Sequence, residues 1–126
     1  MNKLLLLSIA LLVGGCGKPP KDLTAEEKQV VGEYEFKNKG GDTYTKIFLE
    51  NGVYEYYKNG HKFPEAKWTV SNGQIHINYP PSDNISSYKI IYRINPDRSI
   101  TEIADIVDGN RTEKEESYQS TYKKIK

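Results

Sequence analysis

The sequence predicts an all-β fold, in which eight antiparallel strands follow one another as a meander and close into an up-and-down barrel. The chain holds ten tyrosines, three phenylalanines and one tryptophan among its 126 residues, a composition that favours strands over helices. Turn signals recur at regular spacing from residue 30 onward, as in antiparallel all-β folds. Between such turns, apolar and polar residues alternate, as a sheet with one buried face requires.

Seven turn signals separate the eight candidate strands. Three of them are the Asn-Gly dipeptides at residues 51–52, 59–60 and 72–73, because Asn and Gly tolerate the positive φ of a type I′ turn. The other four lie at residues 40–41, 80–84, 95–99 and 108–110. Eight short strands in this order can close into a barrel, which removes exposed edges. An open sheet and a two-layer sandwich are the alternatives.

The turn at residues 72–73 sets a register that can be checked from the sequence, because residues opposite each other in a hairpin share a face. A two-residue turn gives an apolar face that pairs Val70 with Ile75, Trp68 with Ile77 and Ala66 with Tyr79. The other face is polar and pairs Thr69 with His76 and Lys67 with Asn78. A slip of one residue would destroy this match, so the sequence specifies the register.

Two further hairpins give a less regular pattern. With residues 95–99 as a five-residue loop, Ile94 faces Ile100, Ile90 faces Ala104, Tyr88 faces Ile106, and Ile91 and Ile103 lie outside. With residues 51–52 as a two-residue turn, Leu49 and Ile47 share a face with Tyr54 and Tyr56, while Phe48 and Tyr57 fall on the other. Pro64 cannot donate a ladder hydrogen bond, so a bulge or a strand start is expected there.

Helical structure is expected only at the start of the domain. Thr24 and Glu27 have the spacing of a capping box, which predicts a short helical turn that ends at about Gln29. Near the other end of the chain, the charged residues 113–116 are expected to form a solvated loop before the last strand, residues 120–125.

The first fifteen residues have the features of an export signal. Lys3 gives a positive start, and residues 4–13 are apolar except for Ser8. As a helix this apolar run would span about 15 Å, roughly half of the bilayer core. It therefore fits a cleaved signal peptide better than a transmembrane helix.

The segment Val13-Gly14-Gly15-Cys16 resembles the lipobox of bacterial lipoproteins. The resemblance implies that a diacylglyceryl group is transferred to the Cys16 thiol, that cleavage falls between Gly15 and Cys16, and that the lipids anchor the protein to a membrane. Residues 16–23, with two prolines, then form an extended tether. Gly17 in place of Asp favours the outer membrane or cell surface if the cell has two membranes. The alternative is an ordinary secreted protein with a chance cysteine.

Residues 24–126 then form one extracytoplasmic domain, and its composition narrows the function. Loss of Lys3 with the signal leaves 17 basic and 17 acidic side chains, a neutral balance that speaks against nucleic-acid binding. Cys16 is the only cysteine, and His61 and His76 are the only histidines, so neither a disulfide nor a metal site is expected. The sequence contains no catalytic or cofactor-binding motif, so we expect no enzyme activity.

Glu102 is the most distinctive candidate binding residue. The register places it on the apolar face beside Tyr92, and a charge inside a small barrel is costly unless it is paired. It could orient a ligand with Tyr92 as its hydrogen-bond partner, or it could lie in water near the barrel mouth. Tyr34, Trp68, Tyr88 and Tyr92 could line a pocket, or they could fill the core of a barrel this narrow.

Several segments resemble a known family. After the helical turn, Gly32-Glu33-Tyr34 resembles the Gly-x-Trp opening of lipocalins and fatty-acid-binding proteins. Three later segments resemble small bacterial lipoproteins with lipocalin-like domains, namely Phe48-Leu49-Glu50-Asn51-Gly52, Lys67-Trp68 and Tyr122-Lys123-Lys124-Ile125. The resemblance implies a lipocalin-like barrel over residues 24–126.

Two functions follow as hypotheses. The first is a membrane-anchored module that binds a small amphipathic ligand in the barrel, with Tyr34, Trp68, Tyr92 and Glu102 as candidate ligand-binding residues. The second is an envelope lipoprotein that binds another protein through its outer surface, where Tyr57, Ile91 and Ile103 are expected.

Overall fold

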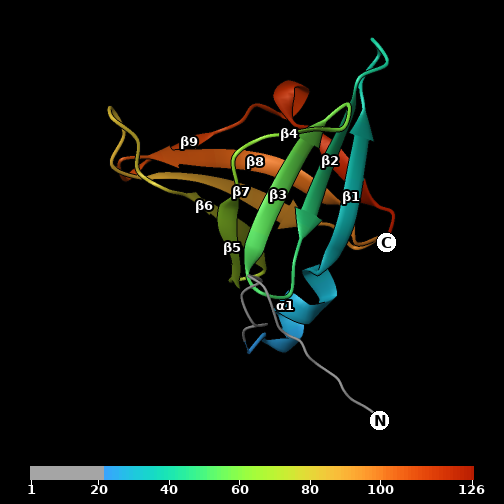
Figure 1. The fold of residues 1–126 in the computed structure, drawn as a ribbon, viewed down its shortest axis with the longest axis horizontal. Helices are drawn as coiled ribbons and strands as arrows, with labels where there is room; N and C mark the ends of the chain where they lie inside the picture. Colours follow the sequence, from blue (N-terminus) through green and yellow to red (C-terminus); the bar gives the residue numbers. More distant parts are fainter. Residues whose placement is uncertain (1–21) are drawn as a thin grey trace.

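The computed structural model describes residues 22–126 (Figure 1). The predicted export signal, its cleavage site at Gly15 and Cys16, and the tether as far as Lys21 lie outside the described residues. Within the described part, no helix has the length and apolar character needed to cross a membrane.

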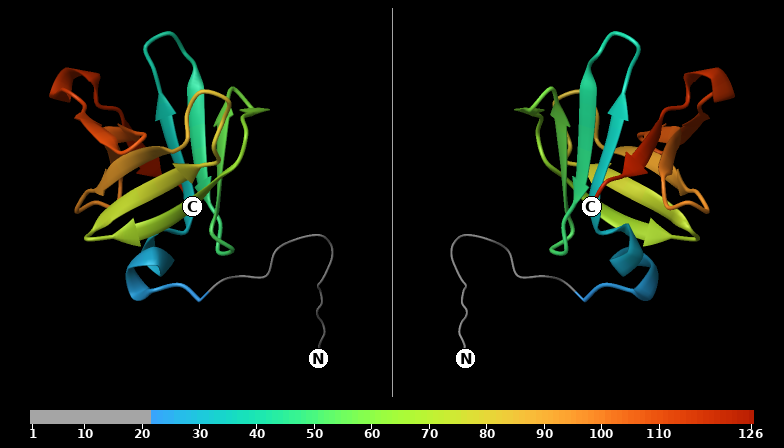
Figure 2. Two further views of the ribbon diagram at one scale, coloured as in Figure 1. Left: turned by 90° about the vertical axis from the view of Figure 1, so that its left-hand side faces the viewer. Right: turned by 90° about the vertical axis from the view of Figure 1, so that its right-hand side faces the viewer.

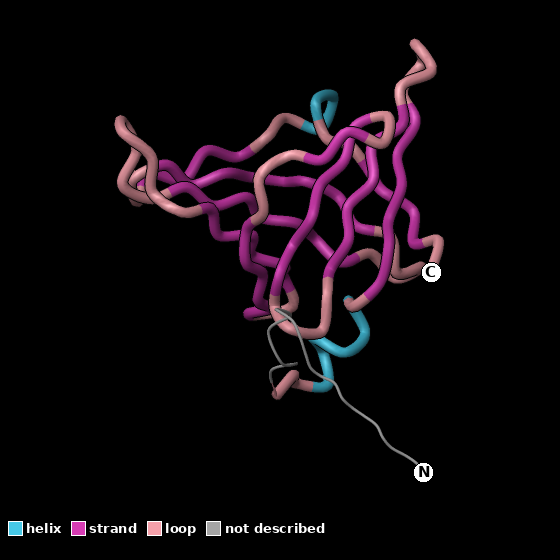
Figure 3. The backbone as a smooth tube through the Cα atoms, in the orientation of Figure 1, coloured by secondary structure: helices cyan, strands magenta, loops and turns pink. Residues whose placement is uncertain are grey.

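The described residues form mostly strands, with one short helix at the start and one 3-10 turn near the end (Figure 3). In chain order the elements are α1 (Ala25–Val30), β1 (Gly32–Lys37), β2 (Thr43–Phe48), β3 (Val53–Lys58), β4 (His61–Lys62), β5 (Ala66–Ser71), β6 (Gln74–Tyr79), β7 (Tyr88–Ile94), β8 (Ile100–Val107), β9 (Asn110–Glu113), η3 (Glu116–Tyr118) and β10 (Thr121–Lys124).

Eight strands form a closed antiparallel barrel, which confirms the predicted up-and-down meander. Around the ring the order is β10-β1-β2-β3-β5-β6-β7-β8. β8 and β10 close the ring, because Ile100 pairs with Tyr122 and Thr101 pairs with Thr121. The hydroxyls of Thr101 and Thr121 also lie 2.7 Å apart and share a hydrogen bond.

Two short strands lie outside the ring. β4 folds back on β3 through the predicted turn at Asn59 and Gly60, both with positive φ. β9 was expected to be turn and loop, but it pairs with residues 104–107 of β8. Asp108 and Gly109 form a tight two-residue turn, and β10 pairs only with the first two residues of β8. The rest of that edge is therefore available to β9.

The helix α1 lies across one end of the barrel (Figure 2). Its predicted capping box is present, since the Thr24 hydroxyl accepts from the Glu27 amide and the Glu27 carboxylate accepts from the Thr24 amide, both at 3.1 Å. The second oxygen of Glu27 accepts from the Val70 amide of β5 at 3.3 Å. One side chain therefore both caps the helix and fixes it to the sheet.

Side chains fill the barrel interior. Phe48 makes edge-to-face contacts with Tyr34 and Trp68, with ring centroids 5.4 and 5.5 Å apart. The buried residues that pack into one cluster come from the helix and from all eight ring strands, and they are Val30, Tyr34, Phe48, Tyr54, Ala66, Trp68, Ile75, Ile77, Tyr92, Ile100 and Tyr122. This packing is typical of an eight-stranded barrel, whose interior is just wide enough for side chains.

The β5–β6 hairpin has the predicted register. Trp68 pairs with Ile77, Val70 with Ile75, and Thr69 with His76. Asn72 and Gly73 have φ of +54° and +73°, as a type I′ turn requires. Pro64 lies between the end of β4 and the start of β5, where an interruption was expected.

The β7–β8 register is correct only near its loop. Ile94 faces Ile100 as predicted, but a β-bulge follows between Ile91 and Tyr92. The extra residue in β8 shifts every later pair by one, so that Ile90 faces Asp105, Lys89 faces Ile106 and Tyr88 faces Val107. Ile91, expected outside and accessible, pairs with His76 and Ala104 and is fully buried. Ile103 is partly buried.

The predicted β2–β3 register is wrong by one residue. The Leu49 amide donates to the Val53 carbonyl, and the Gly52 amide donates to the Leu49 carbonyl, both at 3.0 Å. The loop therefore has three residues and ends on Gly52, which has φ of +86°. A one-residue shift exchanges the two faces of a strand. Phe48 pairs with Tyr54 and Lys46 with Tyr56, so Phe48 and Lys46 point inward in place of Leu49 and Ile47.

Candidate functional site

Two of the sequence-predicted binding residues lie in the core beside α1. Tyr34 is 1% exposed, and its hydroxyl donates to the Val30 carbonyl at 2.7 Å. Trp68 is fully buried, and its indole nitrogen donates to the Leu49 carbonyl at 3.0 Å. The polar atoms of both side chains thus have partners within the chain, and both rings fill the closed end of the barrel.

The other two predicted residues do meet each other. Tyr92 is fully buried and pairs across the ladder with Glu102. Its hydroxyl donates to a Glu102 carboxylate oxygen at 3.1 Å. The other oxygen of Glu102 forms an ion pair with Lys114, which follows β9. The Glu102 side chain retains 17% exposure, so it lies between the core and the solvent.

Lys46 is the buried cation that sequence reasoning missed. It is 3% exposed, and its ammonium donates to the Tyr54 hydroxyl at 2.8 Å. Four tyrosine rings surround the nitrogen, at 4.1 Å for Tyr56, 4.6 Å for Tyr122, 5.1 Å for Tyr92 and 5.5 Å for Tyr54. We refer to Lys46, Tyr54, Tyr56, Tyr92 and Tyr122 as the Lys46 cluster. Each ring presents a surface that attracts a cation.

Burial controls the charge of this cluster. Burial lowers the pKa of Lys46 to about 7, although the Glu102 carboxylate favours the charged form. Burial also raises the pKa of Tyr54 and Tyr92 well above the ordinary tyrosine value. Near neutral pH the tyrosines are therefore neutral hydrogen-bonding groups. Lys46, in contrast, can gain or lose its charge.

A surface groove opens at the junction of β3 and β5. β3 and β5 share only two residue pairs, Val53 with Lys67 and Tyr54 with Ala66. Beyond these two pairs, β3 pairs with β4. The strand β5 pairs with β6 on its other side. The hollow at this junction has a volume of about 440 Å³. We call it the β3–β5 groove, and it is lined by Val53, Glu65, Ala66, Lys67, Asn78, Tyr79 and Pro80.

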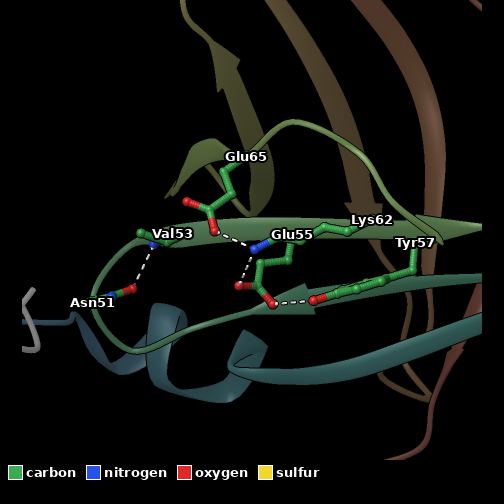
Figure 4. A network of polar contacts seen from close by, with 6 residues as sticks. All are labelled: Asn51, Val53, Glu55, Tyr57, Lys62 and Glu65. Carbon is green, nitrogen blue, oxygen red and sulfur yellow. Dashed lines mark hydrogen bonds and ion pairs between the residues drawn. The ribbon is translucent and has the colours of Figure 1, made fainter. Parts of the chain in front are cut away.

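The rim of the groove is held by ion pairs on β4. Lys62 lies 2.7 Å from the Glu65 carboxylate and 3.3 Å from the Glu55 carboxylate (Figure 4). The Tyr57 hydroxyl donates to the other Glu55 oxygen at 3.1 Å. These contacts fix the segment that contains Glu65 above β3, although each exposed ion pair is weak by itself.

The groove connects to the Lys46 cluster through two tyrosines. Tyr79 lines the groove, and its ring lies edge-to-face on Tyr54 at 6.4 Å. Tyr54 in turn accepts a hydrogen bond from Lys46, so Tyr54 contacts both the buried amine and the ring of Tyr79.

The sequence contained a signal for Lys46. Tyr44, Lys46 and Phe48 are two residues apart along β2, so Lys46 interrupts an aromatic face. The two-residue turn assumed for Asn51 and Gly52 put that face outside, which hid the signal. The groove had no comparable signal beyond the expected interruption at Pro64.

The described residues offer no cluster of metal-ligating side chains. No group of three or more histidine, cysteine or acidic side chains in residues 22–126 could hold a metal ion. Comparison with models of protein families, with curated proteins and with solved structures found no match to this chain. Its function therefore has to be inferred from its own residues and their geometry.

Proposed function

We propose that this chain is a membrane-anchored lipoprotein that binds a small amphipathic ligand in the β3–β5 groove. The observation that carries the proposal is the composition of the groove wall. Val53, Ala66, Tyr79 and Pro80 offer apolar surface, while Glu65, Lys67 and Asn78 offer charged and polar groups. Small-molecule sites combine a largely apolar wall with a few polar groups in this way.

The proposed site is the groove and not the barrel interior. The interior was the expected place for a ligand, with Tyr34 and Trp68 among its walls. Those side chains are fully packed, and the polar atoms of both are bonded within the chain. A ligand in the interior would have to displace this core, whereas the groove is open at the surface.

Anchoring through Cys16 remains part of the proposal. Six Cα–Cα steps lead from Cys16 to Asp22, and an extended chain of six steps spans at most about 22 Å. The described chain begins beside α1, at the closed end of the barrel (Figure 1). If Cys16 carries lipid, the closed end is held close to the membrane surface.

The alternative, a protein partner on the outer surface, receives less support. Ile91, which motivated it, is fully buried. Tyr57 is bonded to Glu55 and only partly exposed. The large apolar side chains that are well exposed among the described residues are Tyr118 in η3 and Ile125, which follows the end of β10. Scattered exposed residues of this kind are normal on a protein surface.

A groove-filling substitution tests the proposal. Full-length protein in lipid nanodiscs is titrated with N-phenyl-1-naphthylamine, a neutral amphipathic probe, and binding is followed by energy transfer from Trp68, the only tryptophan. Asn78→Phe should fill the groove and weaken binding at least about tenfold, equivalent to 1.4 kcal/mol. Lys89→Phe is the matched control, because Lys89 pairs with Asn78 from β7 and does not line the groove. Equal binding by both variants and the parent protein would refute the groove as the site.

Anchoring is tested separately. Mass spectrometry of the protein extracted from membranes should show acyl groups on Cys16 as the first residue. An unmodified amino terminus at another position would contradict the lipoprotein assignment without affecting the groove.

A further inference from the structure

Three asparagine–glycine pairs lie in loops of the described chain, at residues 51–52, 59–60 and 72–73. In such a pair the backbone nitrogen of the glycine can attack the side-chain amide carbon of the asparagine, because glycine has no Cβ to obstruct the approach. The attack needs an asparagine side chain that can turn and a glycine nitrogen that is free of hydrogen bonds. The three pairs have the same chemistry, so the fold decides which of them reacts.

The pair at residues 51–52 is held in place. The Oδ1 atom of Asn51 accepts a hydrogen bond from the Val53 amide at 3.0 Å. Gly52 is buried, and its amide donates to the Leu49 carbonyl at 3.0 Å. Both reacting groups are therefore occupied, and the glycine is shielded from solvent.

The pair at residues 59–60 is exposed, but its asparagine is fixed by both side-chain atoms. Asn59 Oδ1 accepts from the Thr43 amide at 2.8 Å, and Nδ2 donates to the Asp42 carboxylate at 2.9 Å. The Asn59 amide also donates to the Thr43 carbonyl at 2.8 Å. The side chain must therefore break two hydrogen bonds before it can turn towards Gly60.

The pair at residues 72–73 lacks such restraints. Asn72 and Gly73 are both exposed. Within residues 22–126, neither the Asn72 side chain nor the Gly73 amide makes a hydrogen bond. A Cβ added to Gly73 would meet no atom within 4 Å beyond its neighbours in the chain. The asparagine side chain is therefore free to turn onto the glycine nitrogen whenever the hairpin tip fluctuates.

We propose that Asn72 is a site of spontaneous covalent modification, at which the asparagine is converted to aspartate and isoaspartate through a succinimide. The Gly73 nitrogen forms a bond to Asn72 Cγ, and the Cγ–Nδ2 bond breaks. The proton of the Gly73 amide leaves with Nδ2, which departs as ammonia. Water then opens the ring at either of its two carbonyl carbons, so the reaction needs no oxidant, reductant or enzyme. It involves neither the groove nor Cys16 and goes beyond the proposed function.

The two products affect the fold differently. Opening at Cγ gives aspartate with an unchanged backbone, and aspartate tolerates the positive φ of Asn72. Opening at the backbone carbonyl gives isoaspartate, in which the chain runs through the side chain and is one carbon longer. A type I′ turn has only two residues between its strands, so the extra carbon disturbs the turn that sets the β5–β6 register. The isoaspartate form should therefore unfold at a lower urea concentration than Asn72→Asp, which reproduces the other product.

Peptide mapping of aged protein tests the proposal. Full-length protein in lipid nanodiscs is incubated at pH 8.5, and a second sample is unfolded in urea at the same pH. Mass spectrometry with electron-transfer dissociation follows the conversion at each asparagine and distinguishes the two isomers. In the folded protein Asn72 should react at least about tenfold faster than Asn51 and Asn59, equivalent to about 1.4 kcal/mol, the net strength of one or two hydrogen bonds. In urea the three rates should become similar, since the fold no longer distinguishes the pairs.

A substitution tests the protection directly. Asp42→Ala removes the acceptor of Asn59 Nδ2 and should raise the rate at Asn59 about fivefold, equivalent to about 1 kcal/mol. A slow reaction at Asn51 in the same sample shows that the variant is folded. Asp83→Ala is the matched control, because Asp83 is exposed and makes no hydrogen bond or ion pair among the described residues. It should leave all three rates unchanged.

Three results would overturn the inference. The first is a rate at Asn51 or Asn59 that equals the rate at Asn72 in the folded protein. The second is the same order of rates in urea as in the folded protein, because the fold would then not be the cause. The third is an unchanged rate at Asn59 in Asp42→Ala. Probe binding in the groove is measured separately, so none of these results would affect the proposed function.

Discussion

Replacement of Lys46 by methionine should make the protein more stable, even though it removes a hydrogen bond. Burial lowers the pKa of Lys46 from 10.5 to about 7. At roughly 1.4 kcal/mol per unit, this shift corresponds to about 5 kcal/mol of lost stability wherever the amine is charged in both states. The variant also loses the hydrogen bond to Tyr54, which costs about 1 kcal/mol of stability. It loses the cation–π contacts as well, which costs about 2 kcal/mol. At pH 6 the variant should therefore gain about 2 kcal/mol in unfolding free energy.

The pH dependence of this gain is the sharper test. The unfolded chain keeps the lysine proton up to about pH 10.5, whereas the folded protein loses it above about pH 7. The unfolded state thus binds more protons between these values, and the stability of the parent protein rises with pH there. At pH 9 the penalty has fallen to about 2 kcal/mol. The advantage of Lys46→Met should shrink by about 3 kcal/mol between pH 6 and pH 9.

Urea unfolding followed by Trp68 fluorescence measures both quantities. Lys89→Met, which removes an exposed lysine from β7, is the control and should show no pH-dependent difference from the parent protein. Effects of the buried tyrosines cancel, because they are common to all three proteins. A difference between Lys46→Met and the parent protein that is the same at pH 6 and pH 9 would refute the reasoning about the charge of Lys46.

Three further substitutions test other parts of the fold, each by urea unfolding at pH 7. Thr24→Ala removes the N-cap hydroxyl and should cost about 1 kcal/mol; no measurable cost would show that α1 does not contribute to stability. Tyr92→Phe removes a hydrogen bond to the Glu102 carboxylate and should cost about 2 kcal/mol, and a smaller loss would mean that water replaces the hydroxyl. Gly32→Ala should prevent stable folding, because Gly32 has φ of +145° and an added Cβ would lie 2.2 Å from the Lys126 carbonyl oxygen. A soluble Gly32→Ala variant of unchanged stability would show that the chain end moves aside freely.

The fold was predictable from the sequence because most turns carry local information. Asn72 and Gly73 adopt the expected type I′ turn, and that turn fixes every pair of the β5–β6 hairpin. The same dipeptide at Asn51 and Gly52 belongs to a three-residue loop. The difference between the two loops lies in how the flanking strands pair, and the dipeptide itself does not encode it.

The candidate site was harder to predict for the same reason. Tyr92 and Glu102 lie close to a loop whose register was correct, and they meet as expected. Lys46 lies on a strand whose predicted register was off by one, so its inward position was not recognised. A bulge and a loop length thus decide which side chains reach the interior, and both depend on long-range packing. Pocket shape depends in turn on where β3 and β5 separate.

The short strand β9 also bears on how this protein behaves when many copies lie close together. It forms an outer edge of the sheet beyond β8, with all four of its residues exposed. An unpaired edge is a template on which another copy could add a strand. Here that edge is only four residues long and carries the ion pair of Arg111 and Glu113. Short, charged edges disfavour edge-to-edge pairing, so neighbouring copies can be crowded together without assembling into continuous sheets.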